Sequence, residues 1–263
     1  MIPYIAPFWS IKVGSYKVQK IVSFDVFSIR KSPTDHAEIK LPQEGLDLSL
    51  IKKDSPLIIH QGYREQGLWR IFKGTVDNVE PDKDSAMVFA SDQMKVLKKK
   101  ISKAFVQVTP QEIIKYGLQA AGVENYTLSS SSFSSLSGFT SANESVISLF
   151  ERMNKSWNGL EDWDFYFDPE DMFYWGPWEE SPRYQQNNWP KLQYGVNIIS
   201  HNPISETKGI IEIPVLPYLR HSHRIKIQDP RYWSGEKEVR IERVKYHHST
   251  KARMEIEWAQ IAN

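Results

Sequence analysis

The residues best suited to chemistry lie in one acidic and aromatic stretch of the 263-residue chain, 157–189. The stretch holds eight carboxylates and a single cation, Arg183. Its five tryptophans are Trp157, Trp163, Trp175, Trp178 and Trp189. Paired carboxylates beside aromatic rings suit a glycosidase, because one carboxyl protonates the leaving oxygen, the other acts as nucleophile or base, and the rings stack on sugar. The candidate carboxylates are Asp162, Asp164, Asp168, Glu170 and Asp171.

The same carboxylates have a simpler interpretation as parts of a β-hairpin. The stretch predicts strands at 164–167 and 172–175, joined by the turn 168–171, whose composition is typical of a solvated turn. A calcium loop would need ligands at alternating positions around a central glycine, and 168–171 has neither. The turn is therefore the favoured interpretation, and a carbohydrate-binding module or glycosidase centred on 157–189 stays as the alternative.

The histidines offer a second candidate for chemistry. His221 and His223 would share one side of a strand, a spacing that can chelate a metal, but no third ligand is evident nearby. His247 and His248 would point to opposite faces of a strand. The sequence leaves open whether the His221 and His223 pair binds metal, and we predict no metal site.

Sequence motifs of catalysis are lacking. The chain has no Gly-rich phosphate loop, no Gly-x-Ser-x-Gly elbow and no His-Glu-x-x-His. A low-complexity serine run, 129–137, is a poor place to hold a nucleophile rigidly. The sequence therefore favours a protein that is not an enzyme and needs no cofactor.

Charge and composition exclude further classes. Lys and Arg number 33 against 32 Asp and Glu, so no net field favours wholesale binding of nucleic acid or an anionic membrane. The absence of cysteine excludes disulfides and thiolate ligands. The N-terminal residues 1–9 lack a basic region and contain two prolines, so we expect neither a signal peptide nor membrane insertion. An aromatic content of 13% favours strands and assembly interfaces.

Alternating apolar and polar residues predict that the first 90 residues are β structure. The expected strands are 19–29, 36–41, 57–63, 68–79 and 86–90. The middle of the chain predicts helices at 93–100, at 110–121 after the cap Thr109, and at 143–157, with a serine-rich flexible or extended connector at 128–138. Strands return at 210–214, 224–228, 238–246 and 251–259.

The last region is also basic. Between residues 218 and 253 the chain has 10 Lys and Arg against 4 Asp and Glu. Together with its aromatics, this excess permits a third hypothesis, a single-stranded nucleic-acid binder. The near-neutral total charge makes it the least favoured of the three.

An ordered series of short motifs resembles the phage baseplate hub family, which includes the late control D proteins of temperate phages and the N-terminal part of type VI secretion spike proteins. The series starts in the first barrel of that family and runs through its helices to the entry of its second barrel. Its residues here are Gly62, Tyr63, Phe72, Gly74, Val76, Asp92, Leu97, Thr109, Ile113 and Pro217. The segment 220–223 departs from the Pro-Gly-Asp-type turn common in the family.

The resemblance implies a mainly β fold with an α+β insert, in which two small antiparallel β-barrels are joined by a mixed α/β region. The domains would be a first barrel at 1–92, the insert at 93–205 and a second barrel at 206–263. A glycine within a strand, as at Gly74, marks a bend or bulge of the kind that small barrels need.

The resemblance also implies the function of a structural hub. The chain would form a homotrimer that adapts a hexameric tail tube to a trimeric spike and lines the channel for DNA or effectors in transit. Its partners would be the tail tube protein, the spike protein and other baseplate proteins. It would act in the virion tail baseplate of a prophage or contractile injection system and assemble in the bacterial cytoplasm. Because exposed aromatics need cover, the five tryptophans of 157–189 are the expected interface.

Overall fold

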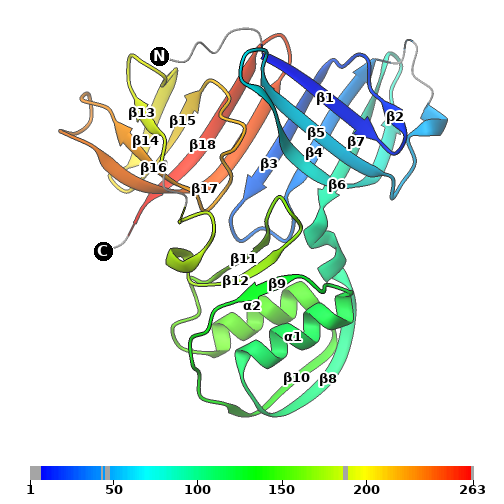
Figure 1. Ribbon diagram of the computed structural model, residues 1–263, viewed down its shortest axis with the longest axis vertical. Helices are drawn as coiled ribbons and strands as arrows, with labels where there is room; N and C mark the ends of the chain where they lie inside the picture. The colour runs from blue at the N-terminus through cyan, green and yellow to red at the C-terminus, as the bar shows by residue number, and fades with distance from the viewer. Residues whose placement is uncertain (1–6, 43, 45–47, 186–188, 262–263) are drawn as a thin grey trace. The chain divides into compact units, whose positions relative to one another are not determined.

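Two compact units make up the chain in a computed structural model, which describes residues 7–42, 44, 48–185 and 189–261 (Figure 1). The first, which we call the sheet unit, comprises Met1–Asp92 and Gln186–Asn263. The second, the helical unit, is Gln93–Gln185. The first and last segments of the chain thus pack into one unit, and the division into three domains stays a prediction. Residues 1–6 of the N-terminal sequence and 186–188 of the loop after the predicted hairpin lie outside the described residues.

The sheet unit is built on one 13-stranded sheet, whose main path has the order β14-β15-β18-β17-β3-β4-β7-β6-β5-β1-β2. Its N-terminal strands are β1 (Pro7–Val13), β2 (Tyr16–Lys17), β3 (Ser23–Ile29), β4 (His36–Pro42), β5 (Pro56–Tyr63), β6 (Gly67–Pro81) and β7 (Ser85–Asp92). Its C-terminal strands are β13 (Lys191–Gln193), β14 (Ser200–Ser205), β15 (Lys208–Ile213), β16 (Arg224–Gln228), β17 (Lys237–His248) and β18 (Ala252–Gln260). A short 3-10 helix, η1 (Leu48–Leu50), precedes β5.

Strand β17 joins the two ends of the chain. Its first half pairs with β16, where Arg240 is opposite Arg224, and its second half pairs with β3, where Arg243 is opposite Ile29. The mainly β fold with an α+β insert is confirmed. The main path of the large sheet runs without a break through β17, and the pairings of its described strands do not show two closed barrels.

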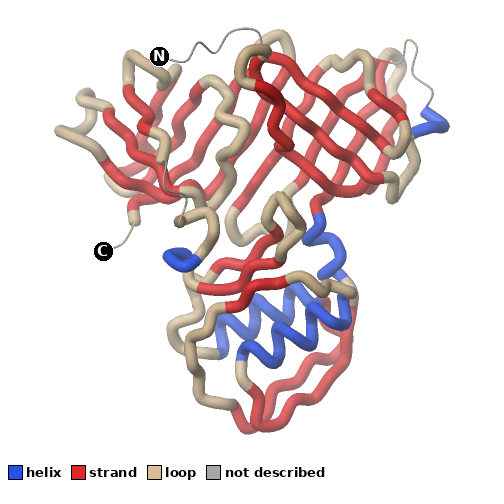
Figure 2. The backbone as a smooth tube through the Cα atoms, in the orientation of Figure 1, coloured by secondary structure: helices blue, strands red, loops and turns tan. Residues whose placement is uncertain are grey.

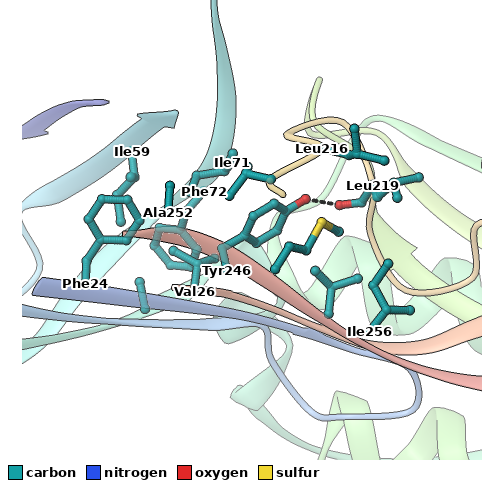
Figure 3. Packing of buried hydrophobic residues seen from close by; sticks show 14 of the residues in the cluster. Phe24, Val26, Ile59, Ile71, Phe72, Leu216, Leu219, Tyr246, Ala252 and Ile256 are labelled. Atoms are coloured by element: carbon teal, nitrogen blue, oxygen red, sulfur yellow. Dashed lines mark hydrogen bonds between the residues drawn. The ribbon is translucent and has the colours of Figure 1, made fainter. Parts of the chain in front are cut away.

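Alternating burial along the strands produces the core of the sheet unit. In β18, Met254, Ile256 and Trp258 are buried while Glu255 and Glu257 are half-exposed, as a two-residue period requires. Figure 3 shows this core around Tyr246 of β17, whose hydroxyl donates a hydrogen bond to the carbonyl oxygen of Leu219. Burial of such apolar side chains contributes about 25 cal/mol per Å².

The helical unit places two helices between two small sheets (Figure 2). Its helices are η2 (Gln93–Lys98), α1 (Pro110–Ala121), α2 (Val146–Ser156) and η3 (Trp178–Glu180). Strands β8 (Lys100–Val108) and β10 (Leu136–Ser145) form an antiparallel ribbon, and β9 (Tyr126–Leu128), β11 (Asp164–Phe167) and β12 (Phe173–Gly176) form the second sheet. No helix of the described residues is long and apolar enough to cross a membrane.

Helix α1 follows the local signals of its sequence. Glu112 accepts hydrogen bonds from the N–H (2.7 Å) and the hydroxyl (2.9 Å) of Thr109, and Pro110 occupies the first turn. Gly122 ends the helix at a φ of 78°, a conformation that favours glycine. Gly117 of α1 lies against the ring of Phe150 in α2, so the two helices approach closely. This predicted helix is confirmed, as is the helix α2.

Several elements differ from the sequence prediction. The expected helix 93–100 is the 3-10 helix η2, and β8 begins at Lys100. Strands β1, β8, β10 and β14 were not predicted. The serine-rich connector 128–138, expected to be flexible or extended, has its ends in β9 and β10, and the carbonyl of Ser134 accepts a hydrogen bond from the Trp157 indole N–H (2.9 Å). Residues 102–104 of β8 are all exposed, so this strand lacks the alternation by which strands are found.

Candidate functional site

The two glycines of the resemblance lie where backbone approaches backbone. A Cβ on Gly62 would lie 1.9 Å from the carbonyl oxygen of Gly67, and one on Gly74 would lie 2.1 Å from that of Ser91. Backbone atoms cannot move aside as a flexible side chain can, so only glycine fits at these two positions without a shift of the backbone. The expected bulge does not fall on Gly74 itself. The register of β6 shifts on both sides of it: before it, between Arg70 and Phe72, which pair with His60 and Ile59 of β5, and after it, between Val76 and Asn78.

The other residues of the resemblance are structural as well. Tyr63, Phe72 and Val76 belong to the core of the sheet unit, and Leu97 and Ile113 to that of the helical unit. The N–H of Asp92 donates to the carbonyl of Asp35 (2.9 Å). The carbonyl of Pro217 accepts a hydrogen bond from Arg220 (3.2 Å). These side chains build the fold and assemble no reactive group.

Most of the five tryptophans are already covered by the chain itself. Trp157, Trp175 and Trp178 are buried, and Trp163 is half-buried against Trp175 with ring centroids 4.6 Å apart. Trp189 belongs to the sheet unit, where the Arg224 guanidinium stacks on its ring at 3.6 Å. The prediction that these tryptophans are exposed is thus wrong for Trp157, Trp175 and Trp178. Their rings are covered within the helical unit.

The acidic hairpin confirms the turn interpretation. Oδ1 of Asp168 accepts hydrogen bonds from the N–H groups of Glu170 (2.8 Å) and Met172 (2.9 Å), and Asp171 takes the left-handed conformation with a φ of 64°. Asp164, by contrast, is buried at the start of β11. Asp168 and Asp171 thus belong to the hairpin turn, and Asp164 to the buried strand that precedes it.

The histidine pair of 220–223 belongs to a buried loop. Nδ1 of His223 accepts from the N–H of Arg220 (2.9 Å), and Nδ1 of His221 contacts the hydroxyl of Ser222 (2.9 Å). Within the part of the chain that the structure describes, no group of three metal-ligating side chains occurs. The two imidazoles therefore form hydrogen-bonding contacts within their own loop, with the Arg220 N–H and the Ser222 hydroxyl.

Arg220 anchors this loop. Its guanidinium donates to the carbonyls of Leu219 (2.7 Å) and Arg70 (2.8 Å) and to the hydroxyl of Tyr246. The segment that departs from the family's turn is therefore tied to strands β6 and β17. The side chains of residues 220–223 are buried.

Five cations of the basic C-terminal region pair with carboxylates on the same strand or on neighbouring strands. The ion pairs are Arg224 with Glu238, Arg240 with Glu242, Arg243 with Glu257, Lys245 with Asp25, and Arg253 with Glu212. We call this set the ion-pair ladder. Asp25, Glu212 and Glu257 lie outside residues 218–253, so they offset about half of the excess charge on which the nucleic-acid hypothesis rested.

Three residues whose contacts sequence reasoning missed have the connectivity of a serine hydrolase. Asp25 Oδ1 lies 2.6 Å from Nδ1 of His247, whose Nε2 lies 3.0 Å from the hydroxyl of Ser249. Ser249 belongs to the turn between β17 and β18, and its N–H donates to the carbonyl of Lys251 (3.1 Å), so it does not serve an oxyanion. Asp25 is also shared with Lys245 (3.5 Å). The arrangement locks the hairpin end to β3.

A second missed group surrounds a buried carboxylate. Asp229 is fully buried and contacts Nδ1 of His201 at 2.8 Å. The Arg231 side chain donates to both of its oxygens, which lowers the pKa of Asp229 to about 2. Tyr232, which is half exposed, packs edge-on against His201. No short sequence pattern signals this group, because His201 and Asp229 are 28 residues apart.

A third missed feature is a row of basic side chains on the outward side of β1, β2, β5 and β6. Its members, which we call the cationic face, are Lys12, Lys17, His60, Arg70 and Lys73. Burial and the charge of Arg70 lower the pKa of His60. A separate cavity of about 350 Å³ lies elsewhere on the sheet, between β14, β15, β17 and β18.

Comparison with known proteins identifies the fold. No family model matches the sequence, and no curated protein matches it. The structure is similar to a tail protein of prophage MuSo2 from Shewanella oneidensis, with a TM-score of 0.72 and 11% identity over 96% of each chain. It is similar to a tail protein from Neisseria meningitidis MC58, with a TM-score of 0.71 and 11% identity over 97% of this chain and 96% of that one.

A third similar structure comes from a secretion machine. It is a component of the E. coli type VI secretion system that is described as structurally similar to T4 bacteriophage tail proteins. The TM-score is 0.70 at 11% identity, covering 96% of this chain and 77% of that one. At such low identity the likeness establishes the fold alone, and the resemblance read from the motif series is confirmed at that level: the chain has the fold of phage tail proteins.

Proposed function

We propose that the protein is a structural subunit of a phage-type tail or a related injection machine, and that it acts as a baseplate hub. One observation carries the proposal: the match to a phage tail protein covers 96% of this chain and 96% of that protein. The type VI secretion component among the similar structures supports the same general role.

In the finer form of the proposal, three copies form a ring that joins a tail tube to a spike. The continuous sheet supports this arrangement, because β17 links an N-terminal and a C-terminal set of strands within one chain. Three copies would present six such sets around a channel, matching sixfold symmetry on one side and threefold on the other. DNA or effectors would pass through that channel, and neighbouring baseplate proteins would bind outside it.

Co-purification with tail partners tests the hub function. The protein is expected to bind the tube protein and the spike protein encoded beside it, and the complex is expected to hold three copies per spike. Failure to bind either partner, with both partners shown to be folded, would overturn the proposal.

The carbohydrate hypothesis has its own test. The buried positions of Trp175 and Trp178 leave these rings no face for a sugar, so we expect no binding to cell-wall polysaccharides. Retention of the protein by an insoluble glycan, lost on replacing an exposed tyrosine such as Tyr232 by Ala, would restore a carbohydrate-binding role at a different surface.

A further inference from the structure

Four apolar side chains are exposed at one end of the C-terminal strands of the sheet unit. Tyr194, Val196 and Ile199 lie between β13 and β14, and Tyr232 lies between β16 and β17. Between 39% and 50% of the surface of each residue is exposed. We call these four residues, together with Arg231, the tyrosine patch. Exposed apolar side chains gathered in this way are typical of an interaction site.

Arg231 joins the two loops into one surface. Its guanidinium lies 3.3 Å from the centroid of the Tyr194 ring and 5.2 Å from that of the Tyr232 ring, so it lies against both rings. Backbone contacts keep the loops beside the strands. The N–H of Tyr194 donates to the carbonyl of Gln228 (3.0 Å), and the hydroxyl of Tyr232 donates to the carbonyl of His201 (3.4 Å).

The buried carboxylate of Asp229 fixes the conformation of this arginine. Nε and Nη2 of Arg231 donate to the two oxygens of Asp229, at 3.0 and 2.8 Å. Among the described residues, Nη1 of the same guanidinium has no hydrogen-bond partner, and 38% of the side chain is exposed. A fully buried carboxylate therefore holds an exposed arginine in one geometry. A partner of the patch consequently loses little free energy to ordering it.

The charge of the two loops argues against a polyanionic partner. Residues 193–199 contain no charged side chain, and residues 230–235 contain only Arg231. The charge of Arg231 is balanced by Asp229, and the cations of the ion-pair ladder have carboxylate partners as well. Nucleic acids and anionic membranes are bound through several unpaired cations, which these loops do not supply. The tyrosine patch therefore suits a partner without a large charge.

The aliphatic members of the patch favour a protein over a sugar. Sugar hydroxyls need hydrogen-bonding groups, which Val196 and Ile199 cannot provide. One face of the Tyr194 ring is also covered by the Arg231 guanidinium, so that face cannot stack on a sugar. Tyrosine and arginine, by contrast, are enriched where proteins bind one another most strongly. The aliphatic side chains can bury apolar groups of a protein, and Nη1 of Arg231 can donate to one of its oxygen atoms.

We propose that the tyrosine patch binds a neighbouring tail protein. The partner buries an apolar side chain against Tyr232 and Val196 and places a backbone or side-chain oxygen on Nη1 of Arg231. The inference rests on the proposed hub function and deepens it, because it identifies a surface through which one partner is held. All members of the patch belong to the sheet unit, so the surface is complete within one unit.

Hydroxyl-radical footprinting of the wild-type protein tests the surface without any substitution. The protein is oxidised alone, with the tail tube protein encoded beside it, and with the spike protein encoded beside it. Mass spectrometry then measures the modification of each tyrosine. Tyr194 and Tyr232 are expected to be modified in the free protein and to lose most of that modification in one of the two complexes. Tyr126, which is exposed in the helical unit, is the internal control and is expected to stay modified.

Substitution measures how much the patch contributes to the affinity. The variant Tyr232→Ala/Val196→Ser is expected to bind the protecting partner at least about tenfold more weakly, because it removes the central buried contact. The matched control, Tyr126→Ala/Ile204→Ser, removes an exposed tyrosine and an exposed aliphatic side chain elsewhere and is expected to bind as wild type does. Titration calorimetry measures the affinities, and circular dichroism checks that both variants are folded.

The proposal is overturned if wild type binds a partner while Tyr194 and Tyr232 stay fully modified, or if the patch variant binds as tightly as the control. Protection of both tyrosines in the protein alone at high concentration would assign the patch to a contact between copies instead. Retention by an insoluble glycan that is lost in the patch variant would assign it to a sugar. The hub function survives each of these results. It fails, and the inference with it, if wild type binds neither the tube protein nor the spike protein.

Discussion

Buried polar groups hold the loops of the sheet unit in single conformations. Asp229 is the clearest case, because its carboxylate is fully buried and accepts hydrogen bonds from His201 and from the side chain and N–H of Arg231. A buried charge of this kind is tolerated only when its partners are complete. The loop after β16, which carries the exposed Tyr232, therefore depends on one carboxylate.

Replacing Asp229 by Asn is expected to lower the free energy of unfolding of the sheet unit by about 3 kcal/mol, because it leaves the Arg231 and His201 donors incompletely paired. Urea titration followed by circular dichroism measures the loss. Glu236→Gln is the control: this residue pairs with Lys191 at the exposed surface, and its loss is expected to change the free energy of unfolding far less than the loss of Asp229 does. Equal losses in both variants would contradict the assigned role.

The same carboxylate predicts a dependence on pH. Hydrogen bonds from Arg231 lower the folded pKa of Asp229 from 3.8 to about 2. A lowered folded pKa stabilises the fold above the unfolded value, and that stability is lost as the pH falls through about 2. Wild type is thus expected to lose more stability than Asp229→Asn between pH 4 and pH 2, which acid titrations at fixed urea compare.

The hydrogen bond of Trp175 leads to a further prediction for a single residue. Its indole N–H donates to Oδ1 of the buried Asn154 (3.0 Å), and the ring is fully covered. Trp175→Phe is expected to destabilise the helical unit by about 1–3 kcal/mol, because Asn154 loses its partner inside the core. Thermal unfolding measures this, and Trp189→Phe is the comparison because its ring lies in the other unit. An unchanged melting temperature would show that Trp175 is not a core residue.

Close approach of α1 and α2 depends on Gly117. A Cβ at this position would lie 2.5 Å from the Phe150 ring, whereas one at Gly138 of β10 would meet nothing nearer than 3.8 Å. Gly117→Ala is expected to destabilise the helical unit by about 1–3 kcal/mol through overpacking. Gly138→Ala is expected to be close to neutral. Denaturant unfolding of the two variants tests the difference, and equal stabilities would contradict the helix packing.

Elements with strong local signals could be predicted, and elements without them could not. The helix α1 has a cap at Thr109, and β18 alternates through Met254, Ile256 and Trp258. The ribbon strand β8 exposes most of its residues, and β1 contains Pro7, so neither has the usual pattern. Pairings across long distances, such as β17 with β3, follow from the fold and not from local sequence.

The candidate site residues likewise include some whose role could be predicted from the sequence and some whose role could not. The composition of residues 168–171 is typical of a turn, and the predicted turn is confirmed. Burial of Trp175 could not be read from composition, because an aromatic-rich stretch is equally consistent with a core and with an interface. The contact of Asp25 with His247 joins residues 222 positions apart, and the cationic face joins four strands, so both required the structure.

Two separate cores imply that the chain does not unfold as one body. The sheet unit and the helical unit each bury their own cluster of apolar residues. Calorimetry is therefore expected to show two transitions, of which Gly117→Ala lowers only the one that belongs to the helical unit. A single transition shifted as a whole by this substitution would contradict independent cores.

At the scale of the assembly, the central claim is that the protein is a structural hub of a phage-type tail. Cryo-electron microscopy of the protein reconstituted with its neighbouring tube and spike proteins tests it most directly. The account predicts a ring of three copies around a central channel, with the tube protein on one side and the spike on the other. A particle in which the protein is absent, or is bound as a single copy on the outside, would contradict it.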